Sequence, residues 1–239
     1  MTGVILAAGM AKRLRPLTND RPKCLLTIGD RTLLQRTVEA LQSVGITELV
    51  VVTGYLRDMI VDYLDSHFPE MNIRYIDNPD YATTNNIYSL WLSREAVRGK
   101  DFLLLDSDIL FDPAIIRRVL EGEGSSLALN RHPMGEEEMK VVVDSHQQIT
   151  AISKTCAVSD AIGESVGIEK ITADYSAALF RELDQMMIEE RLVDIFYERA
   201  FERLIAQGHT FKVVDTTDLY SEELDTVEDF RKAEAERRC

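Results

Sequence analysis

Short apolar runs alternate with helical patterns through the first half of the chain. The runs have strand length and occupy residues 3–7, 48–53, 72–76 and 101–105. Helices are predicted over residues 33–44, 56–64 and 86–97, and over 113–120, where Asp112 and Pro113 form a cap and first-turn pair. Strands that alternate with helices are typical of a parallel sheet, because parallel strands need long crossover connections. The first half therefore predicts a doubly wound α/β arrangement.

The pattern changes after residue 124. Four strands separated by short turns are predicted over residues 127–130, 140–144, 149–154 and 164–171. Helices follow near 173–185 and 190–206, then a strand at 210–214 and a helix at 226–237. We therefore expect a mixed, mostly parallel central sheet with helices on both faces and a small antiparallel section.

Composition excludes several classes of protein. The 239 residues are 45% hydrophobic, enough for a substantial core, but no run approaches the roughly 18–20 apolar residues of a membrane span. No basic region precedes the first apolar run, so we expect no signal peptide and a cytoplasmic protein. The cysteines, Cys24, Cys156 and Cys239, lack the spacing of a zinc site or a disulfide framework. A net charge of -14 disfavours binding to nucleic acid.

One segment runs against this acidic balance. Residues 11–23 hold one acid, Asp20, and five cations: Lys12, Arg13, Arg15, Arg21 and Lys23. Just before them, the small residues Ala7, Ala8 and Gly9 allow a ligand to approach the backbone N–H groups. The segment matches neither common glycine-rich phosphate motif. It indicates an anion site, and a solvated basic loop is the alternative.

Two acids follow the strand at 101–105. Asp106 and Asp108 lie at the carboxyl edge of the predicted sheet, where open α/β sheets bind ligands. Mg²⁺ commonly takes one or two carboxylates and leaves its other positions to phosphates. A magnesium site is one interpretation of this pair, and a loop with two solvated acids is the other.

The basic segment also carries a family resemblance. Its sequence resembles the signature of the bacterial nucleotidyltransferase family in four stretches: Leu6-Ala7-Ala8-Gly9, Arg13-Leu14, Pro16-Leu17-Thr18 and Pro22-Lys23. The resemblance implies a Rossmann-like fold whose loop wraps a triphosphate, with Arg13 and Lys23 as catalytic cations. Nucleotide-binding residues implied in this part of the chain are Leu6, Ala7, Ala8, Gly9, Lys12, Arg13 and Lys23. Ala11 departs from the usual pattern, which has a second glycine there.

The resemblance extends to the acids. Asp108 matches the family's metal ligand, and residues 224–229 resemble its closing motif, in which Asp225 matches a second ligand. A bound Mg²⁺ and a nucleotide contact by Asp106 are implied. From the residues alone, Asp225 could instead be an ordinary helix N-cap.

A third stretch suggests the branch of the family. Residues 81–90 resemble the phosphocholine cytidylyltransferase branch, which includes phosphoethanolamine and aminoethylphosphonate relatives. CTP as the nucleotide follows from this resemblance, with Tyr81, Asn85 and Asn86 at the nucleotide and Ser89 near the acceptor. Alternatively, Asn85 is a helix N-cap with Tyr88 and Trp91 packed behind it.

The remaining acceptor assignments lie in the second half. By resemblance, Lys154 contacts the acceptor phosphate and Gly167 leaves room for it, with weaker support for Lys140. If the acceptor carries an ammonium group, a carboxylate or an aromatic face must bind it, and the candidates are Tyr81, Tyr88, Glu164 and Asp194. The sequence does not rank them.

These observations predict one nucleotidyltransferase domain over residues 1–239, with a nucleotide-binding half at 1–122 and an acceptor-binding half with a closing helix at 123–239. The predicted reaction joins CMP from CTP to phosphocholine, phosphoethanolamine or 2-aminoethylphosphonate and releases pyrophosphate. A sugar-1-phosphate or inositol-1-phosphate nucleotidylyltransferase is the alternative enzyme. A nucleotide sensor without turnover is the alternative of another class. We expect no partner that is a nucleic acid or a membrane.

Overall fold

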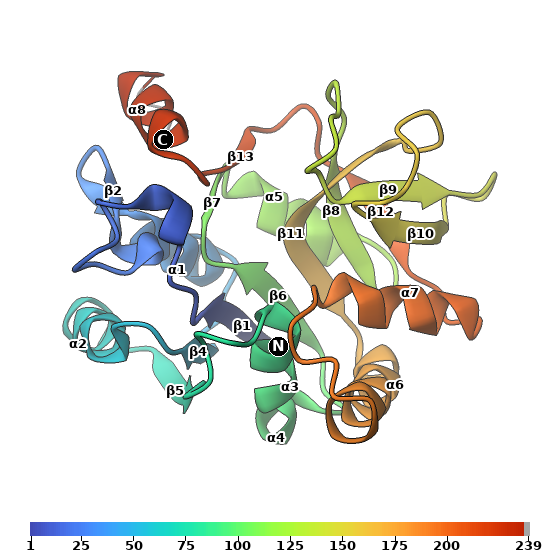
Figure 1. Cartoon of the computed structure of the whole chain (residues 1–239), viewed down its shortest axis with the longest axis horizontal. Coiled ribbons are helices and arrows are strands. Elements are labelled where there is room, and N and C mark those ends of the chain that lie inside the picture. Colours follow the sequence, from blue (N-terminus) through green and yellow to red (C-terminus); the bar gives the residue numbers. More distant parts are fainter. Residues whose placement is uncertain (237–239) are drawn as a thin grey trace.

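A mixed nine-stranded sheet runs through the computed structural model, which describes residues 1–236 (Figure 1). Its parallel part is β1 (Thr2–Ala7) between β4 (Glu48–Thr53) and β6 (Phe102–Asp106), with β5 (Asn72–Asp77) beside β4. The second half adds β8 (Ser126–Asn130), β9 (Lys140–Val143), β10 (Ile149–Ser153), β11 (Gly163–Ile171) and β12 (Lys212–Asp215). β11 pairs antiparallel with β6, β8 and β9, which confirms the antiparallel section.

Helices cover both faces of the sheet because side chains of successive strand residues point to opposite faces. Val4 and Leu6 of β1 pack on one side with α3 (Asn86–Leu92), α4 (Arg94–Val97), α6 (Ala173–Asp184) and α7 (Glu198–Ala206). Ile5 and Ala7 pack on the other with α1 (Leu33–Ser43), α2 (Arg57–His67) and α5 (Ala114–Glu121). The continuous apolar run of β1 is thus buried on both faces.

Two predicted helices differ from the structure. The helix expected over 86–97 is divided into α3 and α4 at Ser93, whose hydroxyl donates to the carbonyl of Leu90 at 2.6 Å. The helix expected over 190–206 begins only at Glu198, because a π-helical turn at Gln185–Glu189 precedes an irregular segment. In that segment the Val193 carbonyl accepts from the Asn85 N–H at 2.9 Å, so tertiary contacts replace helical hydrogen bonds.

Short strands absent from the prediction close the fold. β2 (Thr27–Ile28) pairs with β3 (Arg31–Thr32), and β7 (Ile109–Phe111) pairs antiparallel with β13 (Ser221–Glu223). After β13 comes α8 (Val227–Glu236); position 237 of the expected final helix lies outside the described residues. Within residues 1–236, no helix combines the length and the apolar character needed to cross a membrane.

A cluster of aromatic rings joins the core to the irregular segment. Phe201 of α7 is fully buried, and its ring centroid lies 5.5 Å from that of Tyr197 and 4.9 Å from that of Phe211. Tyr175 completes the cluster at 6.2 Å from Phe201. Close packing of this kind fixes where the chain just before α7 can lie.

Phe201→Ala should lower the free energy of unfolding by about 3–5 kcal/mol, because it removes a buried ring and leaves a cavity. Phe201→Leu keeps most of the volume and should cost less than about 1.5 kcal/mol. Urea unfolding followed by circular dichroism measures both. Equal losses in the two variants would show that ring packing at Phe201 is unimportant.

Candidate active site

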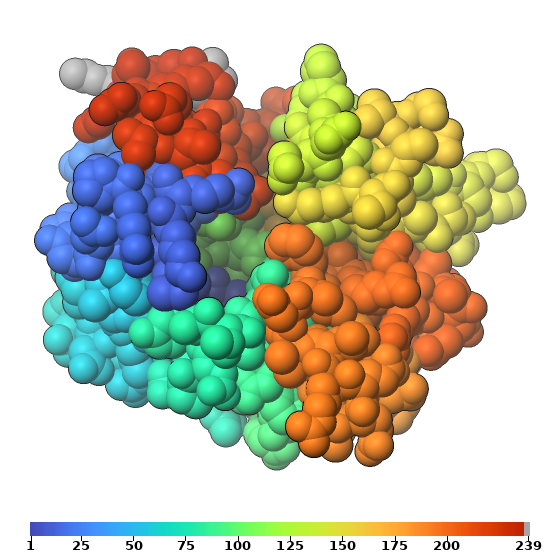
Figure 2. All heavy atoms as spheres, viewed as in Figure 1, coloured from blue at the N-terminus to red at the C-terminus, as the bar shows by residue number. Residues whose placement is uncertain are grey.

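A cavity opens at the carboxyl ends of the parallel strands. Figure 2 shows the hollow between the blue and teal first half and the yellow and orange second half. Most of the residues predicted from the sequence line it: Leu6, Ala7, Ala8, Gly9, Arg13, Lys23, Tyr81, Asn85, Asn86, Ser89, Asp106, Asp108, Lys154, Glu164, Gly167 and Asp225. The structure therefore gathers side chains from widely separated segments at one place.

Four candidates lie elsewhere. Lys12 and Asp194 are exposed and do not line the cavity, and Tyr88 packs against Trp91, with ring centroids 5.5 Å apart. Lys140 is buried, and its Nζ donates to the carbonyl of Lys154 at 2.8 Å and to two carbonyls of residues 136–138. Its ammonium group thus stabilises the turn that presents Lys154.

The loop after β1 keeps a glycine-like path despite the alanine at position 11. Ala11 has a φ of 44° and a ψ of 54°, in the left-handed region that glycine favours. Its carbonyl accepts from the Thr18 hydroxyl at 2.9 Å and from the Leu14 N–H at 3.0 Å. These two hydrogen bonds hold the backbone where the usual family pattern would use glycine.

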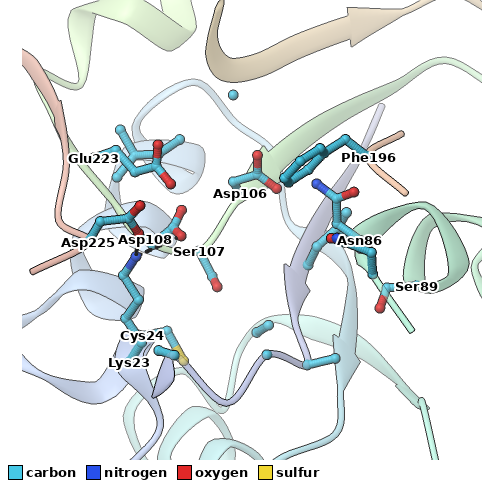
Figure 3. A pocket seen from close by; sticks show the side chains of 18 of the residues that line it. Lys23, Cys24, Asn86, Ser89, Asp106, Ser107, Asp108, Phe196, Glu223 and Asp225 are labelled. Atoms are coloured by element: carbon cyan, nitrogen blue, oxygen red, sulfur yellow. Dashed lines mark hydrogen bonds and ion pairs between the residues drawn. The ribbon is translucent and has the colours of Figure 1, made fainter. Parts of the chain in front are cut away.

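Lys23 is the centre of the charged side of the cavity. Its Nζ donates to Asp108 Oδ2 at 2.8 Å and to Asp225 Oδ1 at 2.7 Å, and Arg13 also pairs with Asp225 (Figure 3). The side chain of Lys23 is only 10% exposed. Burial alone would lower the pKa of Lys23, but the two carboxylates outweigh burial and raise it. Lys23 therefore stays cationic at neutral pH.

The pairing of β7 with β13 explains how Asp225 reaches Asp108 across the chain. The Leu224 N–H donates to the Asp108 carbonyl at 3.1 Å, which fixes the two aspartates side by side. At the start of α8, Asp229 accepts from the Thr226 N–H at 2.7 Å, and the Thr226 hydroxyl accepts from the Asp229 N–H at 3.2 Å. This reciprocal capping leaves the Asp225 carboxylate to the cations.

Three carboxylates can share a cation here. One oxygen each of Asp108, Glu223 and Asp225 lie within 4.8 Å of one another. Oxygen donors of this kind suit a hard cation such as Mg²⁺. Glu223 was missed by the sequence analysis, because only the β7–β13 pairing places it beside Asp108. The donor set therefore fits the metal that the family resemblance implies.

Asp106, which lines the cavity, contacts two fully buried residues, Tyr197 and Glu169. The Tyr197 hydroxyl lies 3.0 Å from Asp106 Oδ2 and 3.3 Å from both oxygens of Glu169. Burial first, and then the charges of Asp108 and Glu169, raise the pKa of Asp106 well above its usual value. The sequence analysis also missed Glu169 and Tyr197; the available signal was a second acid, Glu169, within the predicted strand 164–171. Asp106 is therefore easier to protonate than an exposed aspartate.

Gly167 permits this arrangement. Its φ is +78°, and a Cβ added there would lie 2.9 Å from Asp106 Oδ2 and 3.0 Å from Ile109 Cδ1. The glycine therefore makes room for the Asp106 side chain itself. Whether it also makes room for an acceptor, as the resemblance implies, stays a prediction.

The two asparagines serve the fold as well as the cavity. Asn85 caps α3 by accepting from the Asn86 N–H at 2.8 Å, as the alternative interpretation expected. Asn86 Oδ1 accepts from the Tyr197 N–H at 3.0 Å, which ties α3 to the irregular segment. Figure 3 shows the Asn86 side chain beside Phe196, facing Asp106 across the cavity.

Comparison with known proteins finds a matching family model and related sequences. A model described as a MobA-like NTP transferase domain matches residues 3–203. The CMP-5'-(3-aminopropyl)phosphonate synthase of Streptomyces rubellomurinus is 31% identical over 97% of this chain, which spans only 38% of that protein. The choline-phosphate cytidylyltransferase of Streptococcus pneumoniae is 26% identical over 98% of this chain and 97% of its own length.

Solved structures agree on the fold. The CTP:phosphocholine cytidylyltransferase of Streptococcus pneumoniae superimposes with a TM-score of 0.78 at 24% identity over 99% of both chains. The inositol-1-phosphate CTP transferase of T. maritima gives a TM-score of 0.79 at 22% identity, over 95% of this chain and 90% of that one. These likenesses confirm the mixed α/β architecture.

The three carboxylates predict divalent-cation binding that does not depend on substrate. Mn²⁺ titration followed by electron paramagnetic resonance should show a site in the parent protein, and Asp108→Asn or Asp225→Asn should weaken it by about tenfold or more. Asp218→Asn, which alters an exposed acid paired with Arg118, should leave Mn²⁺ affinity unchanged. Undiminished affinity in both site variants would place the metal elsewhere.

Proposed function

Because the chain belongs to the MobA-like NTP transferase family and is a nucleotidyltransferase, we propose that it transfers CMP from CTP to a small phosphorylated or phosphonate acceptor and releases pyrophosphate. The observation that carries the proposal is Lys23, held between Asp108 and Asp225 at the end of the basic loop. The relatives named CMP-5'-(3-aminopropyl)phosphonate synthase and choline-phosphate cytidylyltransferase support the choice of CTP and of the acceptor class. We infer a cytoplasmic reaction, because CTP is a cytoplasmic substrate.

The charged wall suits the nucleotide end of this reaction. An acceptor oxygen attacks the α-phosphorus in line, the new P–O bond forms, and the bond to the β-phosphate oxygen breaks with its electron pair on pyrophosphate. Arg13 and Lys23 neutralise charge that builds on the leaving group, while the backbone of residues 7–9 approaches the phosphates. Lys23 can exchange its carboxylate partners for phosphate oxygens without moving far.

Magnesium held by Asp108 and Asp225 would supply Lewis-acid chemistry and help to neutralise the phosphates. The protein needs no general base, because a phosphate or phosphonate acceptor is already deprotonated at neutral pH. Among residues 1–236, His132 lies beside the cavity wall, and its Nε2 is 2.6 Å from Glu164. Catalysis in this scheme is positioning and charge neutralisation.

A sugar- or inositol-phosphate acceptor is the second candidate. Beside the main cavity lies a further polar recess lined by Asn130, Ser221 and Glu222, whose side chains can bind hydroxyl groups. The fold shared with the inositol-1-phosphate CTP transferase is compatible with this acceptor. A sensor without turnover would bind nucleotide through the same loop.

Pyrophosphate release distinguishes these functions. With magnesium, we expect release only with CTP, tested against UTP, GTP, ATP and dTTP, and only with phosphocholine, phosphoethanolamine or 2-aminoethylphosphonate as acceptor. Release with glucose-1-phosphate or inositol-1-phosphate would favour the second candidate. CTP binding without release for any acceptor would favour the sensor.

Lys23→Ala should lower kcat by about 10²–10³-fold, because the variant loses a buried cation that neutralises the leaving group. Arg21→Ala is the matched control: Arg21 belongs to the same basic segment but is exposed and outside the cavity, so its variant should keep the parent rate. Steady-state kinetics with saturating CTP measures both. If the Lys23→Ala enzyme were as fast as the parent, Lys23 would have no catalytic role.

A further inference from the structure

Glu198 is a buried acid in the cavity with an unused acceptor atom. It is the first residue of α7, it lines the cavity, and it is 6% exposed. Its Oε2 is buried and has no hydrogen-bond partner among residues 1–236. A buried carboxylate oxygen without a donor is costly, so such an atom needs an explanation.

The surrounding residues do not satisfy this oxygen. The Tyr197 hydroxyl donates hydrogen bonds to Asp106 and Glu169, and the Ser165 hydroxyl donates to Glu169 at 3.3 Å. Burial raises the pKa of Glu198 to about 7, while its own backbone N–H and Lys154 act in the opposite direction. Glu198 is therefore an acid that a donor arriving in the cavity would stabilise.

The other candidate partners for an ammonium group are less suitable. The Glu164 carboxylate is paired with His132 at 2.6 Å. Asp194 is exposed and lies outside the cavity lining. Phe196 lines the cavity, but Lys154 Nζ already lies 4.9 Å from its ring centroid. Among these side chains, Glu198 alone combines burial, a place in the cavity and an oxygen without a donor.

We propose that Glu198 binds the ammonium group of the acceptor and selects an ammonium that carries at least one N–H. This inference rests on the proposed transferase function and narrows its acceptor class to primary, secondary or tertiary amines with a phosphate or phosphonate end. The unpartnered oxygen needs a hydrogen-bond donor, and a charge-assisted N–H···O bond is stronger than a neutral one. A trimethylammonium group has no N–H and would leave Oε2 without a donor.

The decisive experiment compares acceptors that differ by one methyl group. Pyrophosphate release is measured with CTP, magnesium and phosphoethanolamine or its N-methyl, N,N-dimethyl and N,N,N-trimethyl forms, the last being phosphocholine. The parent enzyme should retain kcat/KM within about threefold through the dimethyl form and lose about 30-fold or more at the third methyl. This test needs no variant, so a folding defect cannot obscure it.

Glu198→Gln keeps the shape of the side chain and removes its charge. For phosphoethanolamine it should raise KM so that kcat/KM falls by about 30- to 100-fold, with kcat changed little. For 2-hydroxyethyl phosphate, which has a hydroxyl in place of the amine, kcat/KM should change by less than about threefold. The KM for CTP should not change.

Glu202→Gln is the control, because Glu202 lies one turn further along α7 and pairs with Arg199 at 2.9 Å. This variant should keep the preference for the amine over the hydroxyl acceptor. The inference would be wrong if the parent enzyme turned over phosphocholine as well as phosphoethanolamine. It would also be wrong if a folded Glu198→Gln enzyme kept the parent's preference for the amine acceptor. Failure of the proposed function would look different, because no amine acceptor would then release pyrophosphate at all.

Discussion

The ion pairs of Lys23 hold the charged side of the active site together. One ammonium group contacts Asp108, which follows β6, and Asp225, which precedes α8, at 2.8 and 2.7 Å. These residues come from three distant parts of the chain. Because Lys23 is nearly buried, its attraction to both carboxylates is screened less than a surface pair would be. In a chain with a net charge of -14, this local cation lets two aspartates lie beside the basic segment at residues 11–23.

The end of β6 divides the cavity chemically. Asp106 faces Tyr197 and Glu169 in a wall where burial favours protonated acids, whereas Asp108, two residues later, faces Lys23. The cluster of Lys23, Asp108, Glu223 and Asp225 thus lies apart from Asp106 and its buried partners within one cavity (Figure 3). This separation suits a substrate pair in which a triphosphate meets a small acceptor that is anionic at one end and cationic at the other.

The segment before α7 shows how tertiary contacts can override a helical pattern. Its apolar and charged residues suit a helix, yet the Val193 carbonyl and the Tyr197 N–H are used by Asn85 and Asn86 instead. The helix is delayed until Glu198, and Phe196 and Glu198 line the cavity as a result. Local periodicity could not reveal this, because the competing partners lie about a hundred residues earlier in the chain.

The sequence by itself determined the longer strands, most of the helices and most of the candidate residues that line the cavity. Continuous apolar runs specify buried parallel strands, and the small-then-basic loop together with Asp108 and Asp225 predicted phosphate and metal chemistry through local pattern and resemblance. Only the tertiary structure decided what depends on contacts across the chain. The β7–β13 pairing brings Glu223 to Asp108, and the packing of α7 leaves Glu198 Oε2 without a hydrogen-bond partner among residues 1–236. Proximity and burial are properties of the folded chain, and neither has a local signature in sequence.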